Sequence, residues 1–190
     1  MSIVCIGDSL TFGYGVKETE GWVSVLSRKI EERIINKGIP GNTTCEMKER
    51  FIKDVIEVKP SKVIIMGGTN DLLLNRSIAE VLDNINMMAQ MCKNNKIVPI
   101  VLTPLPVNED IVEKTWFEDM DYKDVNKNLS KLRKSLVEYG KEKDIEVIDL
   151  GTILLKEGKI KNNFLDDGIH VAKEIHSEIA EIILNLKVKF

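Results

Sequence analysis

Short apolar runs alternate along the chain with longer segments in which apolar residues recur every three or four positions. The short runs predict buried strands at residues 3–6, 33–36, 62–66, 97–102 and 145–150. The longer segments predict helices at residues 19–32, 43–58, 77–94, 123–143 and 172–186. Alternation of this kind is typical of an α/β protein, in which right-handed crossovers place helices on both faces of a parallel sheet.

Length and cysteine content add two expectations. The 190 residues contain no repeat, linker or low-complexity segment, so we expect a single domain over residues 1–190. A chain of this size buries roughly 70% of its unfolded surface and needs no covalent staple. Cys5, Cys45 and Cys92 are odd in number and lack C-x-x-C spacing, which predicts free thiols and no structural zinc site.

Charge and hydropathy exclude some partners. Acidic and basic residues are interspersed, the formal net charge is -3, and no basic stripe is present, so nucleic acid is not expected as a partner. The N-terminus lacks a basic segment followed by an apolar one, and no apolar run reaches the length of a membrane span. We therefore expect a cytoplasmic protein without integral membrane association.

Polar residues of catalytic type follow the predicted strands. Ligands of open parallel sheets bind beyond the carboxyl ends of the strands, so these positions are candidates for a site. The first three strands are followed by Gly7-Asp8-Ser9, by Gly41 and by Gly68-Thr69-Asn70-Asp71, and Asp167 and His170 precede the last helix.

Ser9 is the candidate nucleophile and His170 the candidate base. A serine hydroxyl attacks a carbonyl only when a neighbouring base removes its proton, and the chain has two histidines. Asp167 lies three residues before His170, a spacing that lets its carboxylate hold Nδ1 and leave Nε2 for the hydroxyl. Each residue also has a structural interpretation: Asp8 or Ser9 as a helix cap, and His170 as a paired loop histidine. His176 is expected to pack or to lie at the surface.

Three groups are candidates for stabilising an oxyanion. The Asn70 amide and the backbone N–H groups of Ser9 and Gly41 all follow strands, where they can face a carbonyl under attack. Asn70 and Gly41 alone are equally typical of turns. The joint arrangement of nucleophile, donors and base favours a serine hydrolase that forms an acyl-Ser9 intermediate without a metal or an organic cofactor.

The four segments Gly7-Asp8-Ser9-Leu10, Gly41, Gly68-Thr69-Asn70-Asp71 and Asp167-Gly168-Ile169-His170 resemble the blocks of the GDSL (SGNH) esterase and lipase family. The resemblance implies a three-layer, flavodoxin-like fold with five parallel strands in the order 2-1-3-4-5. It also implies a Ser9–Asp167–His170 triad, an oxyanion hole from Ser9, Gly41 and Asn70, and a small acyl ester as substrate. Asp8 and Asp71 belong to the blocks as supporting residues. The chain departs from the family pattern at Val171, where many members have proline.

Two other functions remain open from the residues alone. Asp8, Asp71, Asp167 and His170 are a conceivable ligand set for a metal-dependent phosphoesterase, although such sites usually contain several histidines. A non-catalytic binding module is the other alternative. EDTA sensitivity combined with activity of Ser9→Ala would favour the metal enzyme.

Two further features have no assigned role. Residues 107–122, which include Trp116 and Phe117, are predicted to form a lid over the site or an anchored loop. Asp149, at the end of the fifth strand, is interpreted as a support for the base loop or as a salt-bridge residue.

Overall fold

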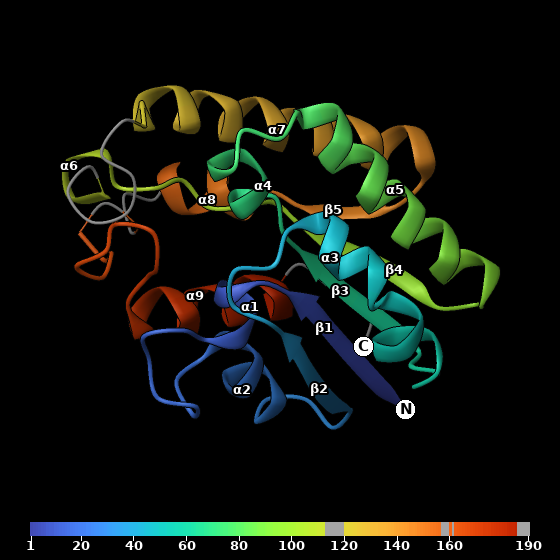
Figure 1. Cartoon of the computed structure of the whole chain (residues 1–190). Helices are drawn as coiled ribbons and strands as arrows, with labels where there is room; N and C mark the ends of the chain where they lie inside the picture. The colour runs from blue at the N-terminus through green and yellow to red at the C-terminus, as the bar shows by residue number, and fades with distance from the viewer. Residues whose placement is uncertain (113–119, 157–159, 161, 186–190) are drawn as a thin grey trace.

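A computed structural model describes residues 1–112, 120–156, 160 and 162–185. Five parallel strands form one sheet with the order β2-β1-β3-β4-β5, which confirms the predicted α/β fold (Figure 1). The strands are β1 (Ser2–Gly7), β2 (Arg33–Gly38), β3 (Lys62–Met66), β4 (Val98–Leu102) and β5 (Glu146–Ile148).

Helices cover both faces of the sheet. The longest of the described helices are α5 (Ile78–Asn94), α7 (Tyr122–Lys143) and α9 (Lys173–Asn185). The shorter ones are α1 (Ser9–Phe12), α2 (Trp22–Ser27), α3 (Thr44–Glu49), the π-helix η1 (Ile52–Ile56), α4 (Thr69–Leu73), α6 (Glu109–Val112) and α8 (Leu150–Lys156). No described helix combines the length and apolar character that a bilayer crossing requires.

Three predicted element boundaries were wrong. The segment 19–32 is helical only over α2, where Trp22, Val23 and Leu26 are buried; beyond Ser27 it is mostly exposed and has no apolar stripe to hold a helix. The segment 43–58 is divided into α3 and η1. The fifth strand ends at Ile148, because Asp149 accepts a hydrogen bond from the N–H of Thr152 and so caps α8.

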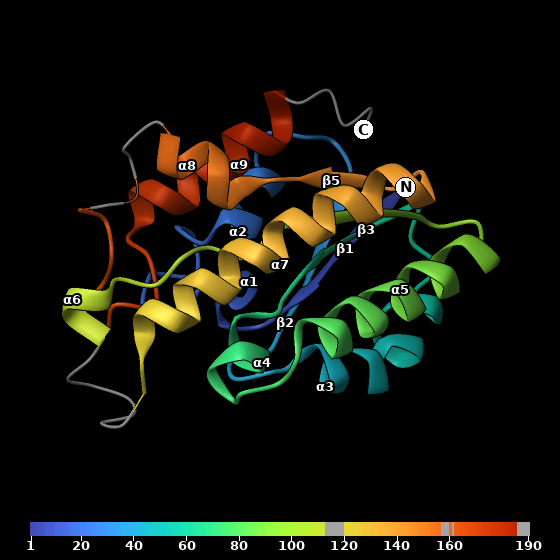
Figure 2. The same cartoon turned by 90° about the horizontal axis from the view of Figure 1, so that it is seen from above.

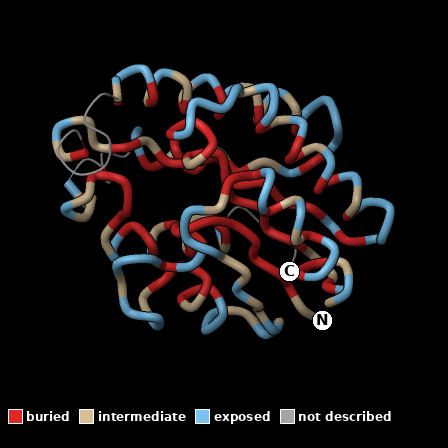
Figure 3. Tube along the Cα trace, in the orientation of Figure 1, coloured by how far each residue is buried: buried red, intermediate tan, exposed pale blue. Residues whose placement is uncertain are grey.

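Helices lie on both faces of the sheet, as Figure 2 shows, and each face carries a hydrophobic core. Side chains from α3, η1, α5 and α7 pack on one face, and those from α2, α8 and α9 pack on the other. Successive residues of β1 alternate between them: Val4 and Ile6 join the first core, and Ile3 and Cys5 join the second. In β1, β3 and β4 every residue after the first is therefore buried (Figure 3).

The strand register brings the carboxyl ends of the strands to one edge of the sheet. Gly7 pairs with both Gly38 and Met66, the last residues of β2 and β3. Met66 pairs with Leu102, and Leu102 pairs with Ile148, the ends of β4 and β5. The segments that follow the strands therefore emerge side by side, and the candidate site residues belong to these segments.

Candidate active site

Ser9 is the first residue of α1, directly beyond the carboxyl end of β1. The Asp8 side chain caps this helix by accepting a hydrogen bond from the Leu10 N–H at 2.9 Å. A Cβ at Gly7 would lie 2.1 Å from the Thr11 hydroxyl and 2.6 Å from the Met66 carbonyl oxygen, so only glycine allows this turn. The capping interpretation was thus right for Asp8, and the cap presents Ser9 at the edge of the sheet.

His170 lies against Ser9 although 161 positions separate them in the sequence. The distance from His170 Nε2 to Ser9 Oγ is 2.8 Å, and that from His170 Nδ1 to Asp167 Oδ2 is 2.6 Å. An ionised carboxylate only accepts hydrogen bonds, so Nδ1 carries the ring proton and the lone pair of Nε2 faces the hydroxyl. The predicted pairing of the three residues is present in the structure.

Asp167 is held by a turn rather than by a helix. Its Oδ1 accepts hydrogen bonds from the N–H groups of Ile169 at 2.9 Å and His170 at 2.8 Å. Burial acts to raise the pKa of Asp167, but these N–H groups and the His170 ring outweigh it and hold the pKa below its usual value. Asp167 is therefore ionised at neutral pH and able to stabilise an imidazolium ion.

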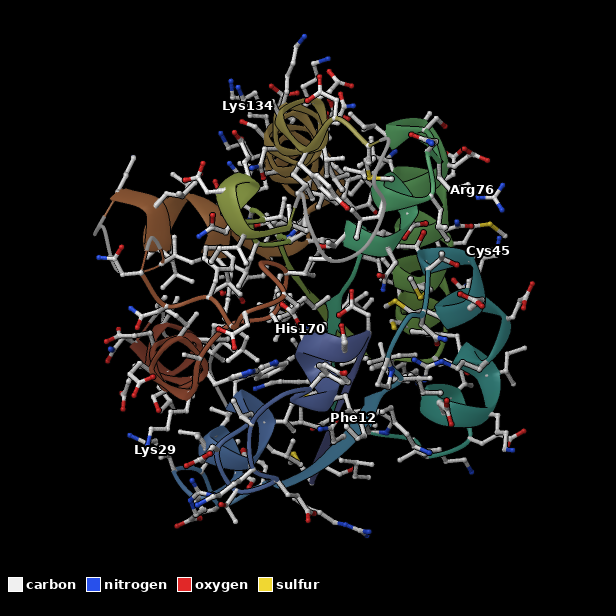
Figure 4. All side chains as sticks on the ribbon, turned by 60° about the vertical axis from the view of Figure 1, so that its left-hand side comes forward. Phe12, Lys29, Cys45, Arg76, Lys134 and His170 are labelled. Atoms are coloured by element: carbon white, nitrogen blue, oxygen red, sulfur yellow. The ribbon has the colours of Figure 1, made fainter. Side chains whose placement is uncertain are left out.

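Packing restricts the orientation of the His170 ring. The Tyr14 ring lies against it with centroids 4.4 Å apart and planes inclined by 39°. Ser9 and His170 are 8% and 4% exposed, so the hydroxyl and the imidazole meet in a largely dry environment. Figure 4 labels His170 beside the blue ribbon that contains α1.

Gly41 and Asn70 lie beside this pair. Gly41 has a positive φ of 81°, and its N–H has no acceptor among the described residues. One N–H of the Asn70 amide binds the Asn42 carbonyl oxygen at 3.0 Å, and the amide carries a second N–H. Ser9 begins α1, so its own N–H has no partner within the helix. Ser9, Gly41 and Asn70, the three predicted oxyanion donors, line the same cavity.

A cavity of about 220 Å³ opens at Ser9 and His170. The lining, as far as the structure describes it, contains no Asp, Glu, Lys or Arg. It consists of Ser9, Tyr14, Pro40, Gly41, Asn70, Leu73, Leu74, Ile169 and His170. The cavity therefore offers mainly apolar surface beside the Ser9 hydroxyl.

Asp8 and Asp71 lie behind the site, and each is 2% exposed. Burial, and secondarily the charge of Asp71, raise the pKa of Asp8 to about 7, despite the hydrogen bond from Leu10. Burial also raises the pKa of Asp71, which accepts hydrogen bonds from Thr44. Among the described residues, no three His, Cys, Asp or Glu side chains gather as a metal site, so the alternative ligand set is not assembled there.

His176 and Asp149, two other residues considered in the sequence, make hydrogen bonds within the fold. His176 is fully buried, and its Nδ1 accepts a hydrogen bond from the Trp22 N–H at 3.2 Å. Asp149 caps α8 and accepts a hydrogen bond from the Thr103 hydroxyl at 3.1 Å. All three cysteines are free thiols, as predicted. Trp116 and Phe117, the aromatic residues of the predicted lid, lie outside the described residues.

Sequence reasoning missed the residues that shape the cavity and its surroundings. Leu73 and Leu74 directly follow the Asn70 block, and Ile169 lies inside the Asp167 block, so their proximity was a usable signal. Tyr14 and Thr44 were not among the sequence candidates. A threonine at the start of a helix gives no signal of a role at a site.

The profile of the GDSL-like lipase/acylhydrolase family matches residues 5–177, which include every candidate site residue. The chain belongs to this family. A structure of the lipase/acylhydrolase from Enterococcus faecalis has 26% sequence identity and a TM-score of 0.80, and the match covers 98% of this chain and 95% of that chain.

Other members of the GDSL-like family match over different lengths. A family structure from Veillonella parvula has a TM-score of 0.84 and covers 100% of both chains at 22% identity, which shows the shared fold. Esterase TesA of Pseudomonas aeruginosa is 29% identical over 97 residues, 48% of this chain and 48% of TesA. An acetylxylan esterase of Geobacillus stearothermophilus is 41% identical over 64 residues, 34% of this chain and 29% of the relative. The chain thus spans less than half the length of these two curated relatives.

Proposed function

We propose that the protein hydrolyses carboxylic esters or thioesters through an acyl-Ser9 intermediate. The observation that carries this proposal is the contact series from Asp167 through His170 to Ser9, with distances of 2.6 and 2.8 Å. This is the geometry that activates a serine hydroxyl. Membership of the GDSL-like family and similarity to two esterases support the same chemistry.

The reaction follows from the positions of these groups. His170 Nε2 removes the Ser9 proton while Oγ attacks the carbonyl carbon, and Asp167 stabilises the imidazolium. The N–H groups of Ser9 and Gly41 and the Asn70 amide bind the oxyanion. The bond to the alcohol or thiol breaks as His170 returns the proton to the leaving group. Water, deprotonated by His170, then attacks the acyl-serine ester; the bond to Oγ breaks, His170 returns the proton to Ser9, and the acid is released.

Ser9→Ala and His170→Ala should each lower kcat for a p-nitrophenyl ester by about 10⁴-fold or more, because each removes part of one proton-transfer unit. Asn70→Ala should lower kcat by about a hundredfold. Ser24→Ala, in α2, is the matched control and should keep wild-type activity.

A fluorophosphonate probe followed by peptide mass spectrometry should label Ser9. Substantial turnover by Ser9→Ala that EDTA abolishes would instead favour the metal-dependent phosphoesterase.

The cavity points to a short, uncharged acyl group. At about 220 Å³, the cavity lies below the range of roughly 300–1,000 Å³ that is usual for pockets binding drug-sized ligands. Pro40, Leu73 and Ile169 offer apolar surface and no counter-ion for a charged chain. We therefore propose substrates with short acyl chains.

A p-nitrophenyl ester series from acetate to dodecanoate tests this size limit. We expect kcat/KM to be highest within the short esters and to fall at least tenfold by decanoate, where the chain exceeds the cavity. Leu73 is 6% exposed and should limit the depth of the cavity. Leu73→Ala should therefore shift the preference toward longer acyl chains. Leu74 is 53% exposed at the mouth, and Leu74→Ala should leave the preference unchanged. A maximum at decanoate or longer in the wild type would contradict the size limit.

A further inference from the structure

A buried network joins the two segments that carry Gly41 and Asn70. The Asp71 carboxylate, in the first turn of α4, accepts the Thr44 N–H at 2.9 Å and the Thr44 hydroxyl proton at 2.7 Å. Thr44 is the first residue of α3 and follows Gly41 by three positions. The bond from Asn70 to the Asn42 carbonyl oxygen runs beside this contact. Two adjacent bridges therefore tie residues 70–71 to residues 42–44.

The direction of the hydrogen bonds in this network is determined. Lys48 Nζ donates to Asn84 Oδ1 at 2.6 Å, so the other end of the Asn84 amide is a donor. Asn84 Nδ2 donates to the Thr44 hydroxyl oxygen at 3.1 Å, and Thr44 in turn donates to Asp71. A lysine cation is thus connected to a buried carboxylate through two neutral side chains. This arrangement stabilises the Asp71 charge without a direct ion pair.

We propose that Asp71 and Thr44 are positioning residues that hold the Gly41 N–H and the Asn70 amide at the separation an oxyanion requires. This inference rests on the proposed function, because it assigns the network a role in binding the oxyanion. Donors stabilise a transition state only when they are held in advance at about 2.7–3.1 Å from the developing charge. A bridge between the donor segments provides that rigidity, since neither Gly41 nor Asn70 is fixed by a strand.

Thr44→Val tests the role of the hydroxyl. Valine keeps the branched shape and the backbone N–H of residue 44 but loses the hydrogen bond from the Thr44 hydroxyl to Asp71. We therefore expect kcat to fall at least tenfold while KM changes less than twofold. Affinity for a trifluoromethyl ketone, which forms an oxyanion on Ser9, should fall by the same factor as kcat. Thr44→Ser restores the hydroxyl and should recover activity to within about threefold.

Thr43→Val is the matched control for stability. Thr43 caps the same helix in a capping box with Glu46 but does not contact Asp71, so its loss should lower Tm without lowering kcat. Lys48→Met is a milder variant that keeps the fold should Thr44→Val not be soluble; it should lower kcat about two- to fivefold. Equal kcat in Thr44→Val and Thr43→Val, with Ser9→Ala inactive, would overturn the positioning role alone. Activity in Ser9→Ala would overturn the proposed function instead.

Discussion

Asp8 places a buried carboxylate immediately before the candidate nucleophile. Its Oδ1 accepts the Leu10 N–H and so shapes the first turn of α1. Burial, together with the nearby Asp71 charge, raises the pKa of Asp8 to about 7. Burial also raises the pKa of Asp71, although Asp71 accepts two hydrogen bonds from Thr44 that act to lower it. Asp8 therefore exchanges a proton near neutral pH.

Asp8→Asn should remove a pH-dependent cost of folding. The folded-state pKa of about 7 lies above the unfolded value of 3.8, so the folded protein binds the extra proton, and the contribution of Asp8 to stability falls as pH rises from about 4 to 7. Between these pH values the contribution of Asp8 to the free energy of unfolding changes by at most about 4 kcal/mol. Asparagine cannot ionise and still accepts the Leu10 N–H. Urea unfolding at pH 4.5 and pH 8 measures the free energy of unfolding of both proteins. We expect the free energy of the variant, relative to that of the wild type, to be higher at pH 8 than at pH 4.5. The same difference between the two proteins at both pH values would contradict this prediction.

At the scale of elements, the sequence predicted what depends on local pattern and missed what depends on packing. The strand and helix order, and the segments that carry Ser9 and His170, followed from apolar spacing and turn residues. The end of β5 could not be predicted in this way. Leu150 continues the apolar run that includes Ile148, and only the Asp149 cap separates the strand from α8. The shortness of α2 depends on which of its residues are buried, and that is settled by contact with α9.

The site itself divides in the same way. Ser9, Asp167 and His170 were found because their residue types and positions after strands are sufficient to suggest catalysis. The bridge from Asp71 to Thr44 was not found, because a threonine at a helix start is ordinary in any sequence. The contact between Asp71 and Thr44 forms only when the fold brings α3 and α4 together beyond the ends of β2 and β3.

At the scale of the whole molecule, the helices on one face also fix the base. The loop with His170 leads directly into α9, which packs against α2. His176 of α9 accepts the Trp22 N–H through Nδ1, so its proton is on Nε2. Protonation of Nδ1 would break this bond and bury a charge where the residue is fully enclosed. Burial, with the nearby His170 as a second cause, therefore lowers the pKa of His176 to about 4.

This histidine should make folding sensitive to acid. Its folded pKa of about 4 lies below the ordinary histidine value of 6.5, so the unfolded chain binds the proton first, and stability present above pH 6.5 is lost as pH falls toward 4. The loss approaches about 3 kcal/mol. Over the same range Asp8 acts in the opposite direction, because its protonation favours the folded state. The two contributions largely cancel in the wild type.

Single variants should separate these opposing contributions. His176→Asn keeps an acceptor for the Trp22 N–H but cannot titrate, so its free energy of unfolding should rise relative to the wild type between pH 6.5 and 4.5. Asp8→Asn should instead lose stability over that range, because only the histidine contribution remains. Urea unfolding of the wild type, both single variants and the double variant at three pH values measures the slopes. Parallel slopes for the wild type and His176→Asn would show that His176 binds its proton equally in the folded and unfolded chains, and α9 would then not depend on a neutral imidazole.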